Sequence, residues 1–100
     1  MPDCILAIML GILEFETTGA KLHQIAAASG YEPGTAHRLQ LPLIRRGWAV
    51  RLDFANRWWV TERGKIAVAI EIGRRSRARA ENRMGNYRRS RIRDFERAAA

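Results

Sequence analysis

The first apolar segment of the chain is an unbroken run of ten residues, Cys4–Leu13. Pro2 and Asp3 precede the run, and proline is tolerated in a first helical turn while aspartate can cap one. The pattern predicts a helix that is apolar on every side and that ends before Gly19. Because such a helix must be covered all round, we expect one side to face the core of its own domain and the other side to face a second copy of the chain.

Two shorter helices are predicted after this run. Apolar and small residues recur at positions i, i+3, i+4 and i+7 within residues 21–29, and Gly30 is the expected left-handed stop. Residues 31–34 turn the chain, and a third helix begins at Thr35 and extends to about Arg46. Two short helices joined by a tight turn that contains glycine are the signature of a helix-turn-helix.

Pro42 lies inside the third predicted helix. A proline at this place removes the hydrogen bond to the Arg38 carbonyl and clashes with it, at a cost of about 3 kcal/mol or a kink. We therefore expect a kinked helix whose first two turns are intact.

The periodicity changes after Gly47. Residues 48–54 alternate, with apolar side chains on one face, and residues 58–61 are rich in β-formers, so the two segments predict a hairpin with a turn at 55–57. We expect Trp58 to be buried and Trp59 to be partly exposed. A further apolar helix follows over 65–72. The order of elements predicts a mainly α fold with a small β-hairpin, namely a winged helix-turn-helix.

The charge of the chain is concentrated at its C-terminal end. Of the formal net charge of +8, ten arginines against three acidic residues place +7 on residues 74–97, and residues 1–73 carry only +1. We therefore expect a winged helix-turn-helix domain over 1–73 and an arginine-rich C-terminal helix or arm over 74–100. Arginine donates two hydrogen bonds to one phosphate and stays charged, so this arm favours a polyanionic partner. Mutual repulsion predicts that its distal part is frayed without that partner.

Three segments of the sequence are similar to a known family. Residues 22–30 (Leu-His-Gln-Ile-Ala-Ala-Ala-Ser-Gly), 35–39 (Thr-Ala-His-Arg-Leu) and 45–48 (Arg-Arg-Gly-Trp) resemble the DNA-binding domain of the IclR-type transcriptional regulators. The resemblance covers roughly residues 4–70 and implies a winged helix-turn-helix that binds double-stranded DNA. Gln40 departs from the pattern, because the family keeps an apolar residue there. The effector-binding domain of that family has no counterpart in these 100 residues, so we infer no small-molecule effector.

The third helix carries the strongest candidates for DNA contact. At about 100° per residue, Ala36, Leu39 and Leu43 share the face that packs on the first two helices, and the opposite face is free for the major groove. Arg38 is the best candidate for a bidentate contact with guanine, and Thr35 at the helix start suits a phosphate. The predicted contacts are Thr35, His37, Arg38, Arg45 and Arg46 in the recognition helix, Arg51, Arg57 and Trp59 in the wing, and Arg74, Arg75, Arg77 and Arg79 in the arm.

A homodimer would place two such helices in successive major grooves. We expect the first apolar helix to form its interface, joined by the segment 66–72. The predicted interface residues are Ile5, Ile8, Met9, Ile12 and Ile70.

Several other functions are disfavoured. The sequence has no glycine-rich phosphate loop and no carboxylate pair at usable spacing, and Cys4 lies in an apolar helix where a thiol is inert, so we do not expect an enzyme. Two histidines without a CxxC motif predict no metal site, and no cofactor is expected. The ten-residue apolar run is too short to span a bilayer and lacks the features of a signal peptide, which predicts a cytoplasmic, nucleoid-associated protein.

The sequence therefore predicts a sequence-specific DNA-binding protein, a small dimeric transcriptional regulator of the kind found in phages and mobile elements. The alternative is a protein-interaction module, in which the winged fold is a scaffold and the arm docks on an acidic protein surface or a nucleoprotein complex. The nearly neutral charge of residues 1–73 and the position of Pro42 both favour this alternative.

Overall fold

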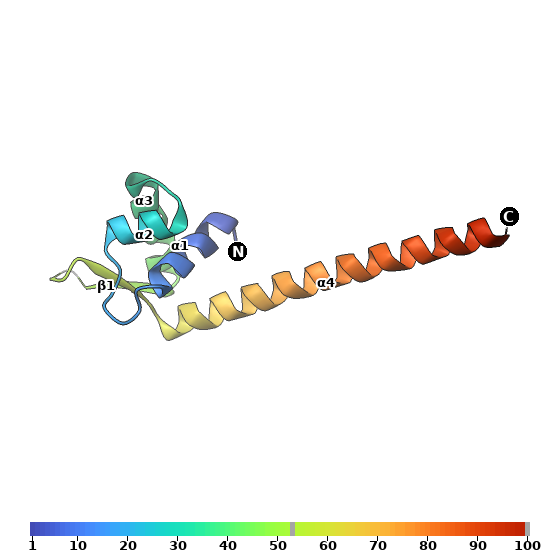
Figure 1. Cartoon of the computed structure of the whole chain (residues 1–100). Coiled ribbons are helices and arrows are strands. Elements are labelled where there is room, and N and C mark those ends of the chain that lie inside the picture. Colours follow the sequence, from blue (N-terminus) through green and yellow to red (C-terminus); the bar gives the residue numbers. More distant parts are fainter. Residues whose placement is uncertain (53, 100) are drawn as a thin grey trace. The chain divides into compact units, whose positions relative to one another are not determined.

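The structure, a computed structural model, describes residues 1–52 and 54–99, and the side chains of 1–52 and 54–82. Residues 1–69 form one compact unit and residues 70–100 form a second. The elements shown in Figure 1 are, in order, α1 (Asp3–Leu13), α2 (Leu22–Ser29), α3 (Pro33–Arg45), β1 (Ala49–Leu52), β2 (Arg57–Val60) and α4 (Glu62–Ala99). This is the mainly α winged helix-turn-helix that the sequence predicts. None of the helices described is both long and apolar enough to cross a membrane.

Helix α1 is the centre of the first unit. It packs against α2, α3 and β2, and Ile8, Met9 and Ile12 are completely buried. The apolar run is therefore covered by the chain's own elements, and Leu10 is its one exposed large side chain. The expectation that a second copy covers this helix is wrong for four of the five predicted interface residues, because the core of the same chain already encloses them. Those four are Ile5, Ile8, Met9 and Ile12.

The helix-turn-helix follows the predicted pattern with one shift. Helix α2 ends at Gly30, whose φ of 81° is the expected left-handed stop. Helix α3 begins at Pro33, two residues before the predicted start, because the fixed φ of proline suits the first helical position. The helix continues through Pro42 to Arg45, so its first two turns are intact as predicted.

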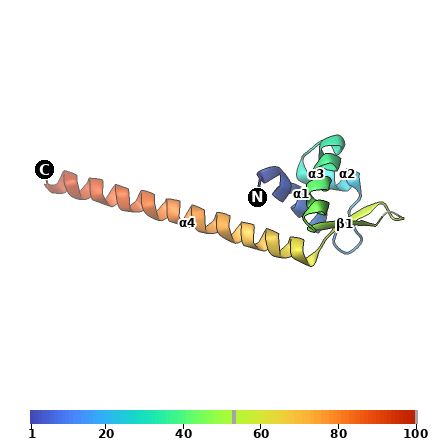
Figure 2. The ribbon, with the colours of Figure 1, turned by 180° about the vertical axis from the view of Figure 1, so that it is seen from behind.

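The hairpin is a two-stranded antiparallel sheet with the register Ala49↔Val60 and Leu52↔Arg57. Its turn includes Asn56, which adopts a positive φ of 51°. Trp58 is 2% exposed and Trp59 is half-buried, as the sequence predicts. Figure 2 shows, from behind, that the hairpin projects away from the three helices.

The α1–α2 loop, residues 14–21, ties the hairpin and the start of α4 to the helices. Ala20 and Trp58 exchange two backbone hydrogen bonds of 2.9 Å each. The Glu16 carbonyl accepts a hydrogen bond of 3.1 Å from the Trp59 indole N–H. The Glu16 carboxylate forms an ion pair with Lys65, and this hydrogen bond raises the pKa of the lysine. The loop therefore holds three segments that are far apart in the sequence.

The start of α4 lies directly against the backbone that precedes β1. The Thr61 hydroxyl donates to the Gly47 carbonyl over 2.5 Å and accepts the Gly64 N–H over 3.1 Å, which caps the helix. A Cβ atom on Gly64 would lie only 2.1 Å from the Trp48 carbonyl oxygen. Only glycine allows this close approach of two backbones.

In the second unit, a buried carboxylate binds two arginines. The Glu71 carboxylate accepts hydrogen bonds from Arg74 Nη2 over 2.6 Å and from Arg75 Nε over 2.9 Å. The hydrogen bonds from Arg74 and Arg75 lower the pKa of Glu71 to about 2. Glu71 therefore remains ionised under all but strongly acidic conditions.

The contact at Gly64 generates a stability prediction. We expect Gly64→Ala to lower the free energy of unfolding by about 1–3 kcal/mol, because the methyl group would clash with the Trp48 carbonyl. Gly34→Ala is the matched control, since a Cβ atom there meets nothing within 4 Å, and it should stabilise the protein by about 0.4–1 kcal/mol. Urea denaturation of both variants measures the difference. Equal effects of the two substitutions would contradict this account of the start of α4.

The Glu71 pair generates a pH prediction. Because its pKa in the folded state is lowered, its contribution to stability should be fully present above about pH 4.5 and should be lost as the pH falls towards about 2. Thermal unfolding of the wild type and of Glu71→Gln, followed by the helical circular dichroism signal, should therefore differ above pH 4.5 and converge near pH 2. A difference that is the same at pH 2 and pH 6 would show that the ion pair is not its source.

Candidate nucleic-acid interface

Helix α3 has two chemically different faces. Ala36 and Leu43 are completely buried, and Leu39 packs half-buried against the core. His37 and Arg38 on the opposite face are exposed. The predicted division of this helix is confirmed, and the exposed face begins in its first turns.

Arg38 is held only loosely by its own domain. Its Nη2 lies 3.5 Å from the Thr35 hydroxyl, at the limit of a hydrogen bond. No other polar contact of Arg38 is present among the described residues. The guanidinium group is thus next to Thr35 and available to an external acceptor. Arg45 at the end of the helix and Arg46 directly after it are also exposed, and the Arg46 guanidinium lies 5.0 Å from the centre of the Trp48 ring.

The Trp58 ring, on β2, contacts side chains from both α3 and β1. The His37 ring meets the Trp58 ring edge-on, with centroids 6.5 Å apart. From β1, the Arg51 guanidinium stacks on the same ring at 5.1 Å, and its Nη2 donates to Asn56 Oδ1 over 2.6 Å. His37 and Arg51, both predicted contacts, therefore approach a common side chain from two different elements.

The other two predicted wing residues, Arg57 and Trp59, contact the α1–α2 loop. The Arg57 guanidinium donates to the Thr18 and Gly19 carbonyls over 3.2 and 3.1 Å. The Trp59 indole binds the α1–α2 loop and its ring packs against Gly19. Since neighbouring side chains of a strand point to opposite faces, Trp59 lies on the face away from Trp58. Both side chains therefore anchor the hairpin to the loop, and their contact with DNA stays a prediction.

The predicted arm residues divide into two pairs. Arg74 and Arg75 bind Glu71, whereas Arg77 and Arg79 are exposed. Their unit is separate from the one that holds α3. Ile70, the fifth predicted interface residue, is 63% exposed.

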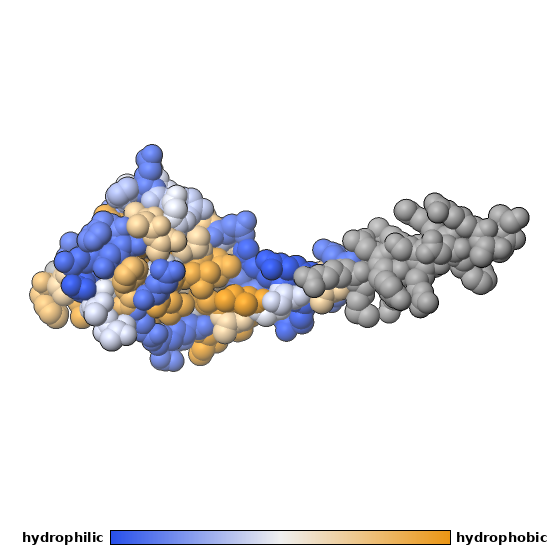
Figure 3. Space-filling view, in the orientation of Figure 1, coloured by the Kyte–Doolittle hydropathy of each residue, from blue (hydrophilic) through white to orange (hydrophobic). Residues whose placement is uncertain are grey.

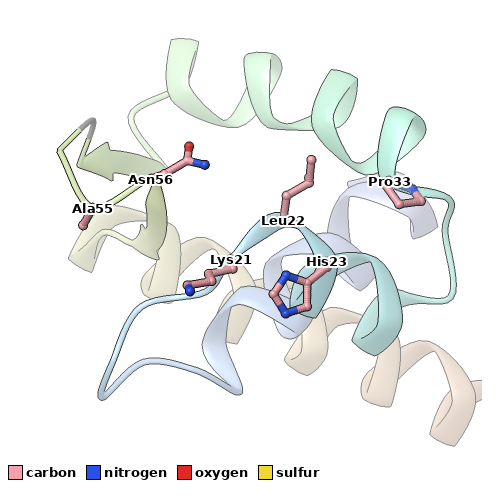
Figure 4. A pocket seen from close by; sticks show the side chains of 6 residues that line it. All are labelled: Lys21, Leu22, His23, Pro33, Ala55 and Asn56. Atoms are coloured by element: carbon pink, nitrogen blue, oxygen red, sulfur yellow. The ribbon is translucent and has the colours of Figure 1, made fainter.

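A groove of about 400 Å³ lies between the start of α2, the start of α3 and the tip of the hairpin. Figure 4 shows Lys21 directly before α2, His23 on α2 and Asn56 on the hairpin around it. Lys21 and His23 are exposed, and the sequence analysis did not select either of them. The only signal that could have found Lys21 is a cation directly before the helix-turn-helix. The lining residues are Lys21, Leu22, His23, Pro33, Ala55 and Asn56.

A second, smaller cavity of about 200 Å³ lies between α3 and the hairpin. Its lining residues are His37, Gln40, Leu41, Ile44, Arg51 and Trp58. Gln40 is 2% exposed, and neither of its amide atoms has a hydrogen-bond partner among the side chains and backbone that the structure describes. The sequence marked Gln40 as a departure from an apolar position but gave no sign that the amide is buried and unpaired.

Apolar side chains also reach the surface of the first unit. Leu41 and Ile44 of α3 and Val50, Leu52 and Phe54 of the hairpin are exposed. Figure 3 shows apolar and polar side chains side by side on one face of this unit. Among the described side chains, no three His, Cys, Asp or Glu residues lie close enough together to hold a metal ion.

The comparisons agree with this geometry. Residues 7–53 match the family model of the IclR helix-turn-helix domain, which covers most of α1, all of α2 and α3, and β1. No curated protein is similar enough to match the chain. The matched residues include the exposed face of α3 and Arg51 of β1. Residues 7–53 of the chain therefore match an IclR-type helix-turn-helix domain.

Proposed function

We propose that the chain is a sequence-specific regulator that binds double-stranded DNA as a homodimer, with α3 in the major groove. The observation that carries this proposal is the exposed first part of α3, where Arg38 has only a long contact with Thr35. The N-terminal part of a recognition helix is the part that reaches base edges. Arg38 accordingly reads a guanine, for which its planar fork is suited.

Neighbouring side chains complete the contact. Thr35 and the exposed Lys21 stand at the starts of α3 and α2, where they suit phosphate groups and fix the orientation of the domain without reading sequence. Leu41 is exposed on the same side of α3 as Arg38 and suits the methyl group of a thymine. Arg51 supports the wing through Trp58 and Asn56.

The arm adds affinity that does not depend on sequence. Arg77 and Arg79 are exposed and bind phosphates, whereas Arg74 and Arg75 first satisfy Glu71. Each phosphate contact releases counterions and so makes binding depend on salt.

Because α1 is buried in the core of its own domain, the proposed dimer must form through another surface. Ile66 and Ile70 are 60% and 63% exposed and stand four residues apart in α4, which places them on one side of that helix. Large exposed aliphatic side chains at this spacing suit a parallel or antiparallel contact with the same helix of a second copy.

A protein-interaction module is the second candidate. Its support is the exposed apolar face of β1, where Val50 and Leu52 share one side, and the exposed Phe54 that follows. Binding through this face would be insensitive to salt, whereas binding to DNA would weaken as salt is raised.

The role of Arg38 can be measured directly. Arg38→Ala should cost about 1–3 kcal/mol on the preferred DNA site and should relax discrimination at one base pair, because a bidentate base contact is lost. The comparison is the double variant Arg77→Gln/Arg79→Gln, which should weaken all sequences alike and reduce the salt slope by about 0.9 per lost contact. Fluorescence anisotropy on the site selected from random duplexes, at several salt concentrations, gives both quantities. If Arg38→Ala weakens every sequence equally, Arg38 contacts a phosphate and not a base.

The proposed dimer surface makes a separate prediction. Ile66→Glu/Ile70→Glu should leave the melting temperature nearly unchanged, because both side chains are exposed, but should convert a dimer into a monomer. Ile72→Glu is the matched control, since this side chain is 44% exposed and lies about 200° around the helix from Ile70. Sedimentation velocity at tens of micromolar distinguishes the variants. A wild-type chain that sediments as a monomer, or equal effects of both charge substitutions, would refute this interface.

A further inference from the structure

We propose that α3 recognises the methyl group at C5 of a pyrimidine, so that the chain distinguishes a methylated cytosine in DNA from an unmodified one. The residue that contacts the methyl group is Leu41, and the guanine contacted by Arg38 lies in the neighbouring base pair. This recognition rests on the proposed function and extends it to a chemical modification of the DNA.

Leu41 is a large apolar side chain that the core of the first unit does not use. It is 50% exposed, whereas Leu43, two residues later, is completely buried. Leu41 is also absent from the partly buried side chains that pack against this core, among the residues that the structure describes. Burial of its side chain is therefore left for a partner of the chain, and would stabilise that contact.

The side chains beside Leu41 indicate what kind of partner covers it. Residues three and four positions apart are neighbours on a helix, which places Arg38 and Arg45 on either side of Leu41. Both arginines are exposed, and the sequence of α3 contains no acidic residue. A surface that is apolar at its centre and positive on both sides complements the major groove of DNA, where the base edges lie between two phosphate backbones.

The chemistry of the major groove limits what an aliphatic side chain recognises there. Among the groups that base pairs present in this groove, the C5 methyl of thymine is the apolar one, and the others are hydrogen-bond donors and acceptors. A cytosine methylated at C5 carries the same methyl group at the same ring position. Leu41 therefore favours thymine over uracil and, by the same contact, 5-methylcytosine over cytosine.

The spacing along α3 relates this methyl group to the guanine of Arg38. The two residues are three positions apart, which is about 4.5 Å along the helix axis and about 60° around it. Successive base pairs are about 3.4 Å apart. The two side chains therefore reach adjacent base pairs, and the preferred step is a C5-methylated pyrimidine next to a guanine.

Removal of single methyl groups from DNA tests this recognition with the full chain. In the duplex selected from random sequences, each thymine is replaced in turn by uracil, which deletes the methyl group and keeps every hydrogen-bonding group. One replacement, beside the guanine whose contact is lost in Arg38→Ala, should weaken binding about fourfold, the effect of one buried methyl group. Fluorescence anisotropy at fixed salt measures the affinities. If no uracil replacement changes the affinity, the proposal is overturned.

A second pair of duplexes tests methylation itself. The two duplexes carry cytosine or 5-methylcytosine at the position found with uracil, and they differ in the methyl group alone. The wild type should bind the methylated duplex about fourfold more tightly. Equal binding of the two duplexes, or tighter binding of the unmodified one, would overturn the proposal.

Leu41→Ala assigns the effect to its residue. This variant should bind the two duplexes of each pair equally, because the shortened side chain no longer contacts the methyl group. Ile44→Ala is the matched control, since it shortens another aliphatic side chain of α3 that is 42% exposed and stands nearly one turn farther from the helix start. The control should keep the fourfold difference, and circular dichroism checks that both variants fold. A difference that persists in Leu41→Ala, or that disappears in both variants, would overturn the role of Leu41.

The outcomes separate this recognition from the proposed function. If the methyl group has no effect but Arg38→Ala still relaxes discrimination at one base pair, α3 reads DNA and the recognition of the methyl group fails. If the chain selects no sequence from random duplexes, the proposed function fails and the recognition of the methyl group fails with it.

Discussion

The two backbone hydrogen bonds between Ala20 and Trp58 fix how the hairpin meets the helices. A two-stranded hairpin is marginally stable by itself in water, and this one has only four residues in each strand. The bridge to Ala20 gives β2 a second backbone partner and presses the Trp58 ring towards α3. As a result, the recognition helix and the wing form one surface.

The same loop also binds two of the predicted wing residues. Glu16, Thr18 and Gly19 bind Trp59 and Arg57, so these two side chains serve to anchor the hairpin. Local sequence could not reveal this, because the partners stand about forty positions earlier in the chain. Alternation along the strand does predict that Trp58 and Trp59 face opposite ways, and that part of the prediction holds. Sequence periodicity predicts which face of a strand a side chain lies on, whereas its hydrogen-bond partner depends on the tertiary fold.

Helix α1 and Gln40 both show what cannot be predicted from the local sequence pattern alone. Ten consecutive apolar residues indicate that a helix must be covered, but do not say whether its own chain has enough elements to cover it. Here α2, α3 and β2 surround α1, and no second copy is needed for that purpose. Gln40 breaks an apolar pattern in the sequence, yet only the fold shows that its amide is buried without a partner. Residues that break the local sequence pattern of a fold are expected at functional or strained sites.

The arginines of the two units of the chain have different surroundings. In the first unit, Arg57 donates to backbone carbonyls, and Arg51 contacts Trp58 and Asn56. Arg38 and Arg45 are exposed on α3, and Arg46 is exposed directly after this helix. In the second unit, Glu71 binds Arg74 and Arg75, and its pKa of about 2 keeps this pairing intact at any physiological pH. Beyond this ion pair, Arg77 and Arg79 of the arm are also exposed. Since phosphate contacts provide affinity and base contacts provide specificity, the proposed function implies that changes in the arm alter affinity without altering the sequence that α3 would read.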